Sequence, residues 1–253
     1  MTNMEKIRLE EMTWVEAKEA LEKAKVVIIP LGAIEAHGPH LPLGTDNFIV
    51  ERIAEEVAKK IGGIVLPVIK YGQVWSLINF PGSLTVSEDS LFRFLVDICL
   101  SLHKHGAKNF AFISFHIGNA TVIKKTARYL KDNYDLNVFY FASSGLSKIR
   151  EFCDSKQWHK NYFHAEEIET SLMLYIKPDL VDMAKAKACY PDKKIFEFYP
   201  QKWDELTDIG VIGDPTVATR EKGEKMLEVI INEIVELLRK GLEFIEKKRE
   251  KHG

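Results

Sequence analysis

The stretch KVVIIPLGAIEAHGPHLPLGTDNFIVERIAEEVAKKIGG, residues 25–63, contains a predicted strand, a polar loop and a predicted helix in direct succession. After Lys25, residues 26–32 are apolar and rich in β-branched side chains, and this run is too short for a helix. Residues 46–63 have the apolar spacing of an amphipathic helix, which Gly62 and Gly63 are expected to end. A buried strand followed by a covering helix is typical of a parallel α/β sheet.

The same alternation continues along the chain. Helices are expected over residues 14–24, 87–106, 119–134, 167–176 and 219–248, and further strands over residues 63–72, 108–115 and 136–144. Ser87 is a suitable N-cap for the helix that follows it, and Gly106 is a suitable stop. We therefore predict an α/β fold in which a mostly parallel sheet is covered on both faces, with residues 1–253 forming a single domain.

Composition and charge narrow the possible partners. The formal net charge is −2, and Lys and Glu are spread along the chain, so we expect neither nucleic-acid binding nor a polybasic membrane patch. No apolar run approaches the roughly 18–20 residues of a membrane helix, and the first residues are unlike a signal peptide. The cysteines, Cys99, Cys153 and Cys189, form no CxxC pattern. Reduced thiols in a cytoplasmic protein are therefore expected.

Imidazoles and carboxylates follow two of the predicted strands. Glu35, His37, His40 and Asp46 lie within a dozen positions after the first strand, and His116 follows the strand over 108–115. Because the carboxyl ends of parallel strands meet at one edge of a sheet, we expect these side chains to converge there. Such a combination indicates a metal site more strongly than any one of these residues does alone.

The spacing within the first loop suits metal binding. Glu35 and His37, two positions apart on an extended segment, would point the same way. A carboxylate such as Asp46 can bridge two divalent ions about 3.5–4 Å apart. Mixed histidine and carboxylate ligands suit zinc, manganese or iron(II). The alternative for Asp46 is to cap the helix beginning at Asn47, a role that the same oxygens cannot easily combine with bridging.

A second polar cluster starts the helix predicted over residues 167–176. It contains His164, Glu166, Glu167 and Glu169. An acidic first turn that complements the helix dipole would account for the glutamates without any ligand. It does not account for His164, although one histidine alone settles little.

Five motifs, in order along nearly the whole chain, resemble those of the creatininase family of amidohydrolases. They are EAHGPHLPLGTDN (35–47), NFPGSLT (79–85), SFHIGN (114–119), HAEEIETS (164–171) and GDPTVATREKG (213–223). The resemblance implies a three-layer α/β/α domain, two divalent metal ions per subunit (zinc, manganese or iron) and hydrolysis of a carbon–nitrogen bond. It also implies a homo-oligomer, with a hexamer as one possibility.

The resemblance also implies roles for individual residues. Glu35, Asp46 and His116 would hold one ion. His37 and Asp46 would hold the other, completed by Glu167, because Gly118 stands where creatininases proper carry a ligand carboxylate.

Two further histidines match family positions. His164 would shuttle a proton at the reacting amide. For His40 we expect a role behind the ligands, which need such support.

Some positions depart from the family pattern: Ser83, Ser114, Phe115, Ile117, Glu166 and the segment 75–79, which lacks a histidine found in many members. These changes leave the metal ligands intact and predict a pocket that is not specific for creatinine. Trp75, Phe80, Trp158 and Tyr162 could line that pocket, although core or interface packing is the better explanation for single aromatic residues.

Three functions remain open at this point. The first is hydrolysis of a small cyclic amide or formamide. The second is a formamidopyrimidine-nucleotide deformylase of riboflavin or deazaflavin synthesis, whose phosphate would need cations such as Lys148, Arg150, Lys156 or Lys160, unless these are ordinary surface residues. The third is a non-catalytic relative that binds a metal or a partner. The C-terminal helix and residues 196–203 could form an oligomer interface or pack on the chain's own core.

Overall fold

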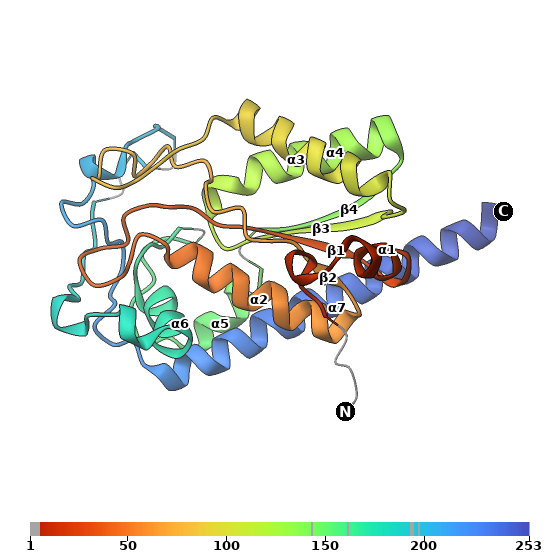
Figure 1. The fold of residues 1–253 in the computed structure, drawn as a ribbon. Coiled ribbons are helices and arrows are strands. Elements are labelled where there is room, and N and C mark those ends of the chain that lie inside the picture. The colour runs from red at the N-terminus through yellow and green to blue at the C-terminus, as the bar shows by residue number, and fades with distance from the viewer. Residues whose placement is uncertain (1–5, 143, 161, 193–194, 197, 253) are drawn as a thin grey trace.

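A four-stranded parallel sheet forms the centre of the molecule (Figure 1). The computed structural model describes residues 6–142, 144–160, 162–192, 195–196 and 198–252. The strands are β1 (Val27–Leu31), β2 (Ile64–Val65), β3 (Asn109–Ser114) and β4 (Asn137–Ala142), in the order β2-β1-β3-β4 with every pairing parallel. The strand expected over 63–72 is shorter in the structure, because Pro67 has no amide hydrogen to continue the ladder.

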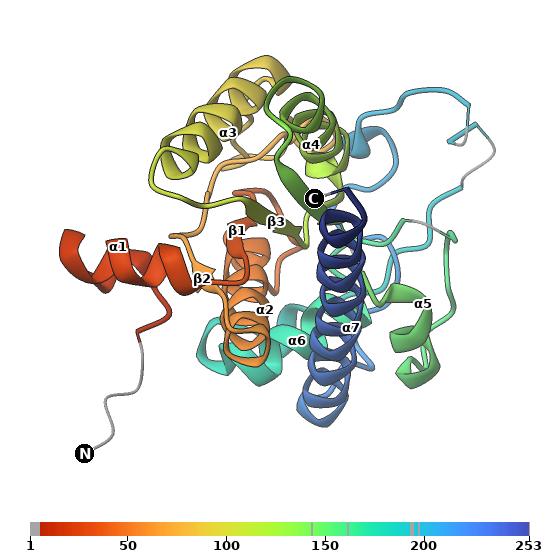
Figure 2. The same ribbon diagram turned by 90° about the vertical axis from the view of Figure 1, so that its right-hand side faces the viewer.

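Helices cover both faces of this sheet, which confirms the predicted three-layer architecture (Figures 1 and 2). The helices are α1 (Trp14–Lys23), α2 (Thr45–Ile61), α3 (Glu88–His103), α4 (Ala120–Tyr134), α5 (Leu146–Ile149), α6 (Glu167–Ile176) and α7 (Arg220–His252). α3 and α4 lie on one face, and α2, α6 and α7 lie on the other. The long α7 packs against α6 and α2.

Two hydrophobic cores result from the alternation of side chains along the strands. In β1, Ile28 points to the core under α2 and α7, while Val27 and Ile29 point to the core under α3 and α4. Apolar residues of α7, including Met226 and Leu238, are buried in the first of these cores. The apolar stripe of the C-terminal helix thus packs on the chain's own core.

The loop between β1 and α2 is held close to the carboxyl end of the sheet. The amide of Glu35 donates to the carbonyl of Leu43 at 3.0 Å, which closes the loop on itself. α2 then begins with Gly44 as N-cap and without a side-chain cap. Asp46 is therefore not the capping residue, and its carboxylate remains available for other contacts.

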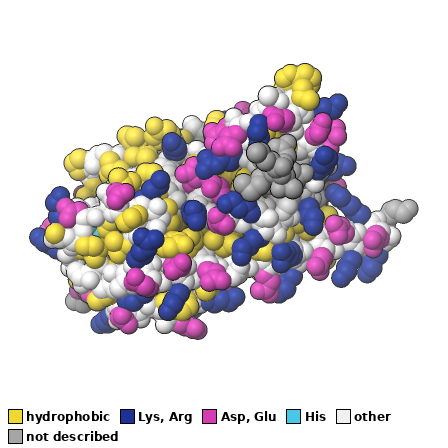
Figure 3. Space-filling view, turned by 60° about the horizontal axis from the view of Figure 1, so that its bottom comes forward, with side chains coloured by type: hydrophobic (Ala, Val, Ile, Leu, Met, Phe, Trp, Pro, Cys, Tyr) yellow, Lys and Arg dark blue, Asp and Glu magenta, His cyan; other side chains and the backbone are white. Residues whose placement is uncertain are grey.

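The surface carries mixed charges. On the face shown in Figure 3, basic and acidic side chains are interspersed, with hydrophobic side chains between them. Among the described residues, no helix is both long and apolar enough to cross a membrane.

Candidate metal centre

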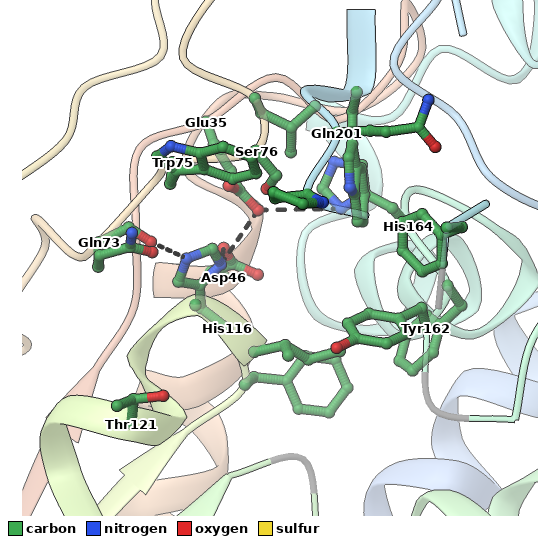
Figure 4. A pocket seen from close by; sticks show the side chains of 18 of the residues that line it. Glu35, Asp46, Gln73, Trp75, Ser76, His116, Thr121, Tyr162, His164 and Gln201 are labelled. Carbon is green, nitrogen blue, oxygen red and sulfur yellow. Dashed lines mark hydrogen bonds and ion pairs between the residues drawn. The ribbon is translucent and has the colours of Figure 1, made fainter. Parts of the chain in front are cut away.

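Three buried carboxylates and four buried histidines gather at the carboxyl end of β1 and β3. Glu35, His37 and Asp46 come from the loop after β1 and the first turn of α2, and His116 directly follows β3. Figure 4 shows Glu35, Asp46, His116 and His164 pointing toward one another at the base of a cavity. The predicted convergence of two strand ends is therefore observed.

His116 presents one ring nitrogen to two carboxylates. Its Nε2 donates to the carbonyl of Gln73 at 2.7 Å, because a carbonyl oxygen can only accept. Its Nδ1 lies 3.1 Å from Oε1 of Glu35 and 3.3 Å from Oδ2 of Asp46. Burial works against a charged ring, but Glu35 and Asp46 outweigh it and raise the pKa of His116 well above its usual value.

His37 has the same arrangement with its nitrogens exchanged. Its Nδ1 donates to the carbonyl of Glu35 at 3.1 Å, which turns Nε2 toward Asp46 Oδ1 at 3.5 Å and Glu169 Oε1 at 3.9 Å. Burial disfavours its charged form, but Asp46, Glu169 and Glu35 together raise its pKa to about 10. Each histidine thus directs one nitrogen at carboxylates and uses the other to hold its orientation, as metal-binding histidines do.

Several buried polar atoms in this cluster have no hydrogen-bond partner among the described residues. They include Glu35 Oε2, His37 Nε2 and Asp46 Oδ2. Buried polar atoms are nearly always paired, so such a concentration needs an explanation. Three sets of ligand atoms among the described residues lie close enough together to hold a cation. Two of them share Asp46, namely Glu35 with Asp46 and His116, and His37 with Asp46 and Glu169, and the third is Glu35 with His37 and His164. Divalent ions would satisfy these atoms, so the residues fit a dinuclear centre with Asp46 shared.

The glutamate in the second set is Glu169, whereas the sequence-based assignment was Glu167. The carboxylate of Glu167 is directed away from the cluster and accepts from Lys222 Nζ at 2.5 Å and from the amides of Asp154 and Ser155 at 3.0 and 2.7 Å. Burial opposes its ionisation, yet Lys222 and these amides lower its pKa. Glu167 thus already has a cation as partner, and it belongs to none of the candidate ligand sets.

Among the described residues Glu169 has no Lys or Arg partner, and its ion-pair contact is with His37. It is buried and accepts from the amide of Ala165 at 2.5 Å. Burial raises its pKa to about 8, with Asp46 adding to the effect and His37 opposing it. The third glutamate, Glu166, pairs with Arg150 at 3.2 Å. Glu166 and Glu167 are therefore distinguished from Glu169 by their basic partners, Arg150 and Lys222. The sequence does not show these pairings.

The family's other ligand position is closed here. A Cβ atom on Gly118 would lie 2.2 Å from the carbonyl oxygen of Gln73 and 2.3 Å from Nε2 of His116. Both contacts are far shorter than van der Waals separation, and the first is with backbone. A carboxylate at position 118 would therefore require the segment around Gln73 to move, which explains why the second set relies on α6.

His164 lies beside the cluster. Its ring is 4.3 Å from that of His37 and 5.0 Å from that of Trp203, centroid to centroid. Nε2 donates to the carbonyl of Ala36 at 2.6 Å, so Nδ1 faces Glu35 Oε1 at 3.8 Å. Burial, and then the neighbouring His37, lower the pKa of His164 well below its usual value. In the neutral ring Nδ1 is therefore the nitrogen without a proton.

His40 lies behind the cluster and outside the candidate ligand sets. Its Nε2 bonds to the hydroxyl of Thr170 at 2.9 Å, which ties the loop after β1 to the residue following Glu169. Burial, and then His37, lower the pKa of His40 to about 4.

A cavity of about 360 Å³ opens above the cluster. Glu35, Asp46, His116, His164 and Glu169 contribute to its floor. Its walls include Trp75 and Tyr162, as the sequence suggested, and also Gln73, Phe196, Tyr199, Gln201 and Trp203. Phe80 and Trp158 instead pack in a small neighbouring core. Lys148, Arg150, Lys156 and Lys160 are not among the lining residues.

Comparison with known proteins agrees with this geometry. The family model described as creatininase (creatinine amidohydrolase) matches residues 10–238. Creatinine amidohydrolase of Pseudomonas putida is 26% identical over 256 residues, covering 90% of this chain and 95% of that protein. The zinc–zinc form of a mutant creatininase superposes with a TM-score of 0.82 at 25% identity, over 94% of this chain and 98% of that one.

A more distant relative has a phosphorylated substrate in its name. It is the 2-amino-5-formylamino-6-ribosylaminopyrimidin-4(3H)-one 5'-monophosphate deformylase of Methanococcus voltae, 22% identical over 240 residues, which covers 86% of this chain and 91% of that protein. The family match extends over most of the chain and includes every residue of the buried cluster. The chain therefore belongs to the creatininase family of hydrolases.

Proposed function

We propose that this protein hydrolyses a carbon–nitrogen bond in a small cyclic amide or formamide and that it uses two divalent cations, zinc, manganese or iron, to do so. The observation that carries the proposal is the set of unpartnered ligand atoms on Glu35, His37 and Asp46 beneath an open cavity. Glu35, Asp46 and His116 would hold one cation, and His37, Asp46 and Glu169 the other. The zinc–zinc form of the related creatininase supports two ions.

Bound divalent cations would supply an activated water and a positive site for the carbonyl oxygen of the substrate. The chain's own residues prepare this site. Gln73 and Ala36 hold His116 and His164 in one tautomer through their carbonyl oxygens. The three carboxylates would offset most of the positive charge of the cations, and they are buried, where electrostatic interactions are strong.

His164 is the residue we assign to proton transfer. The residue lines the cavity, and its Nε2 donates to the carbonyl of Ala36, so Nδ1 is the nitrogen that can accept a proton in the neutral ring. Nδ1 can take the proton released by the attacking water and return it to the leaving nitrogen. Proton transfer by a positioned side chain typically contributes about 10²–10⁴-fold.

A catalytic function is better supported than a purely structural use of the metal. A structural site is closed by protein ligands, whereas a catalytic one keeps a position open. Here Glu35, Asp46, His116 and Glu169 all line the cavity, so a substrate could reach the ligand atoms.

The proposal is tested by metal analysis combined with a hydrolysis screen. We expect about two divalent ions per chain, loss of activity after chelation, and recovery on adding zinc, manganese or iron(II). The screen should include creatinine, other cyclic amides and formamides. A protein that holds two ions but hydrolyses none of these compounds would contradict the amidohydrolase function, and one that holds no ions would contradict the metal centre.

A further inference from the structure

We infer that the cavity selects substrates without a phosphate or other anionic group, and that Glu88 is a residue that sets this preference. The inference rests on the proposed function, because it concerns the substrate of the same site. It separates this protein from relatives that act on nucleotide substrates.

The first observation is the charge of the cavity lining. Among the described residues that line it, four are acidic, namely Glu35, Asp46, Glu88 and Glu169, and none is Lys or Arg. The remaining lining is mostly aromatic or neutral and polar, as with Trp75, Tyr162 and Gln201. Phosphate groups in proteins are usually held by Arg, Lys or free backbone amides. The described lining offers no such cation.

The second observation is that none of the four basic residues suggested by the sequence lines the cavity, and that two of them are paired elsewhere. Arg150 contacts Glu166 at 3.2 Å, and Lys148 contacts Glu233 at 2.9 Å. Lys202 lies close to the cavity wall, but its ammonium group donates to the carbonyl of Trp75 at 2.7 Å and lies 4.0 Å from the centroid of the indole ring. Each of these cations has a partner from the protein itself.

The third observation concerns Glu88, the first residue of α3. A helix N-terminus attracts anions, and that of α3 borders this cavity. Here the first turn of α3 is itself acidic, with Glu88 and Asp89. Asp89 pairs with Lys125 at 3.2 Å, whereas no ion pair joins Glu88 to another described residue. Its exposed carboxylate therefore adds an uncompensated negative charge to the cavity wall.

The floor does not cancel this effect. Two divalent cations would bring four positive charges against the three negative charges of Glu35, Asp46 and Glu169, and loss of one proton from the activated water would bring this sum to zero. Glu88 then remains the unbalanced charge of the described lining. It would repel a phosphomonoester and would favour a neutral or cationic group at the far end of the substrate.

Three formanilides that share the same reacting formamide group and differ in charge test the inference on the metal-loaded protein. They are 4-hydroxyformanilide, 4-(aminomethyl)formanilide and 4-formamidophenyl phosphate, which are neutral, cationic and anionic. We expect kcat/KM for the anionic probe to be about tenfold below that of the neutral probe, since charges a few ångströms apart near a protein surface interact by one to a few kcal/mol. The cationic probe should equal or exceed the neutral one.

Two variants show whether Glu88 causes the discrimination against the anionic probe. Glu88→Gln should raise the ratio of the anionic to the neutral probe several-fold. Asp89→Asn removes the adjacent acid, which does not line the cavity, and should leave that ratio unchanged. An anionic probe that reacts as well as the neutral one, or equal ratios in both variants, would overturn the inference.

Measuring the binding of the three probes, in addition to their turnover, separates this test from the test of the proposed function. If none of the formanilides is hydrolysed, the formamide hydrolase function fails. Quenching of the fluorescence of Trp75 and Trp203, which line the cavity, still gives the three dissociation constants. The same order of affinity would support the charge preference, and tighter binding of the phosphate probe would reject it.

Discussion

The loop after β1 and the start of α6 both supply carboxylates to the buried cluster, but they do so in different ways. In the loop, Glu35 and His37 lie two positions apart and both reach the cluster, Glu35 beside His116 and His37 beside Glu169. At the start of α6, three glutamates within four positions go to three different partners. Glu166 contacts Arg150, Glu167 contacts Lys222, and Glu169 lies beside His37.

The difference shows how far local spacing can specify a site. On extended backbone, alternate side chains share a direction whatever lies around them. On a helix, residues two apart point roughly 200° away from each other. The packing of the helix therefore decides which of its faces meets the cluster. α6 packs closely against α7, because a Cβ atom on Gly223 of α7 would lie only 1.9 Å from the carbonyl oxygen of Ser171 in α6.

The largest expected effect is that of Asp46→Asn, which changes the residue common to both candidate ligand sets. We expect the loss of both ions and activity at the level of the uncatalysed reaction. Metal analysis and turnover measure this result, with Asp132→Asn on the exposed surface of α4 as control. Retention of both ions by the Asp46 variant would show that the loop does not hold a shared ligand.

His164→Ala should lower kcat by about 10²–10⁴-fold, the range of proton transfer by a side chain. Both ions should remain, because the proposed ligand sets do not need this imidazole. Metal content and steady-state kinetics on the same preparation distinguish the two roles. A variant that loses an ion would instead make His164 a ligand, in the grouping with Glu35 and His37 that the distances also allow.

Glu169→Gln and Glu167→Gln form a matched pair on one helix. Glu169→Gln should release one ion and lower activity by more than the about 10–100-fold typical of residues behind a ligand. Glu167→Gln should retain both ions but lower the free energy of unfolding by about 1–3 kcal/mol, because Lys222 loses a charged hydrogen-bond partner. Metal analysis and denaturant titration of both variants give the answer. The reverse pattern would restore the sequence-based assignment.

The smallest effect is expected from His40→Ala, which breaks the contact between the loop and Thr170 of α6. Metal affinity should fall by about 10–100-fold, as is typical of residues that support a ligand. Competition with a chromophoric chelator measures this change. Thr170→Val, which removes the other half of the same hydrogen bond, should have a similar effect. Unchanged affinity in both variants would mean that the two regions are positioned independently.

Much of the fold could be predicted because it depends on local patterns. The expected helix over 167–176 is α6 at the same residues, and the expected helix over 46–63 is α2 with Gly62 at its end in the left-handed conformation. Ser87 caps α3 as expected, accepting from the amide of Ser90. The strand over 63–72 was predicted too long, because apolar composition alone does not show where pairing stops.

The sequence alone determined the alternation of strands and helices and the presence of Glu35, His37, Asp46 and His116 at one edge of the sheet. These features follow from hydrophobic periodicity and from the direction of side chains on extended backbone, both of which are local. Only the tertiary structure decided that Glu169 rather than Glu167 faces His37, and that the described cavity lining has no basic residue. Both depend on where Arg150, Lys222 and α7 lie in space, because the partner of a buried charge comes from distant parts of the chain.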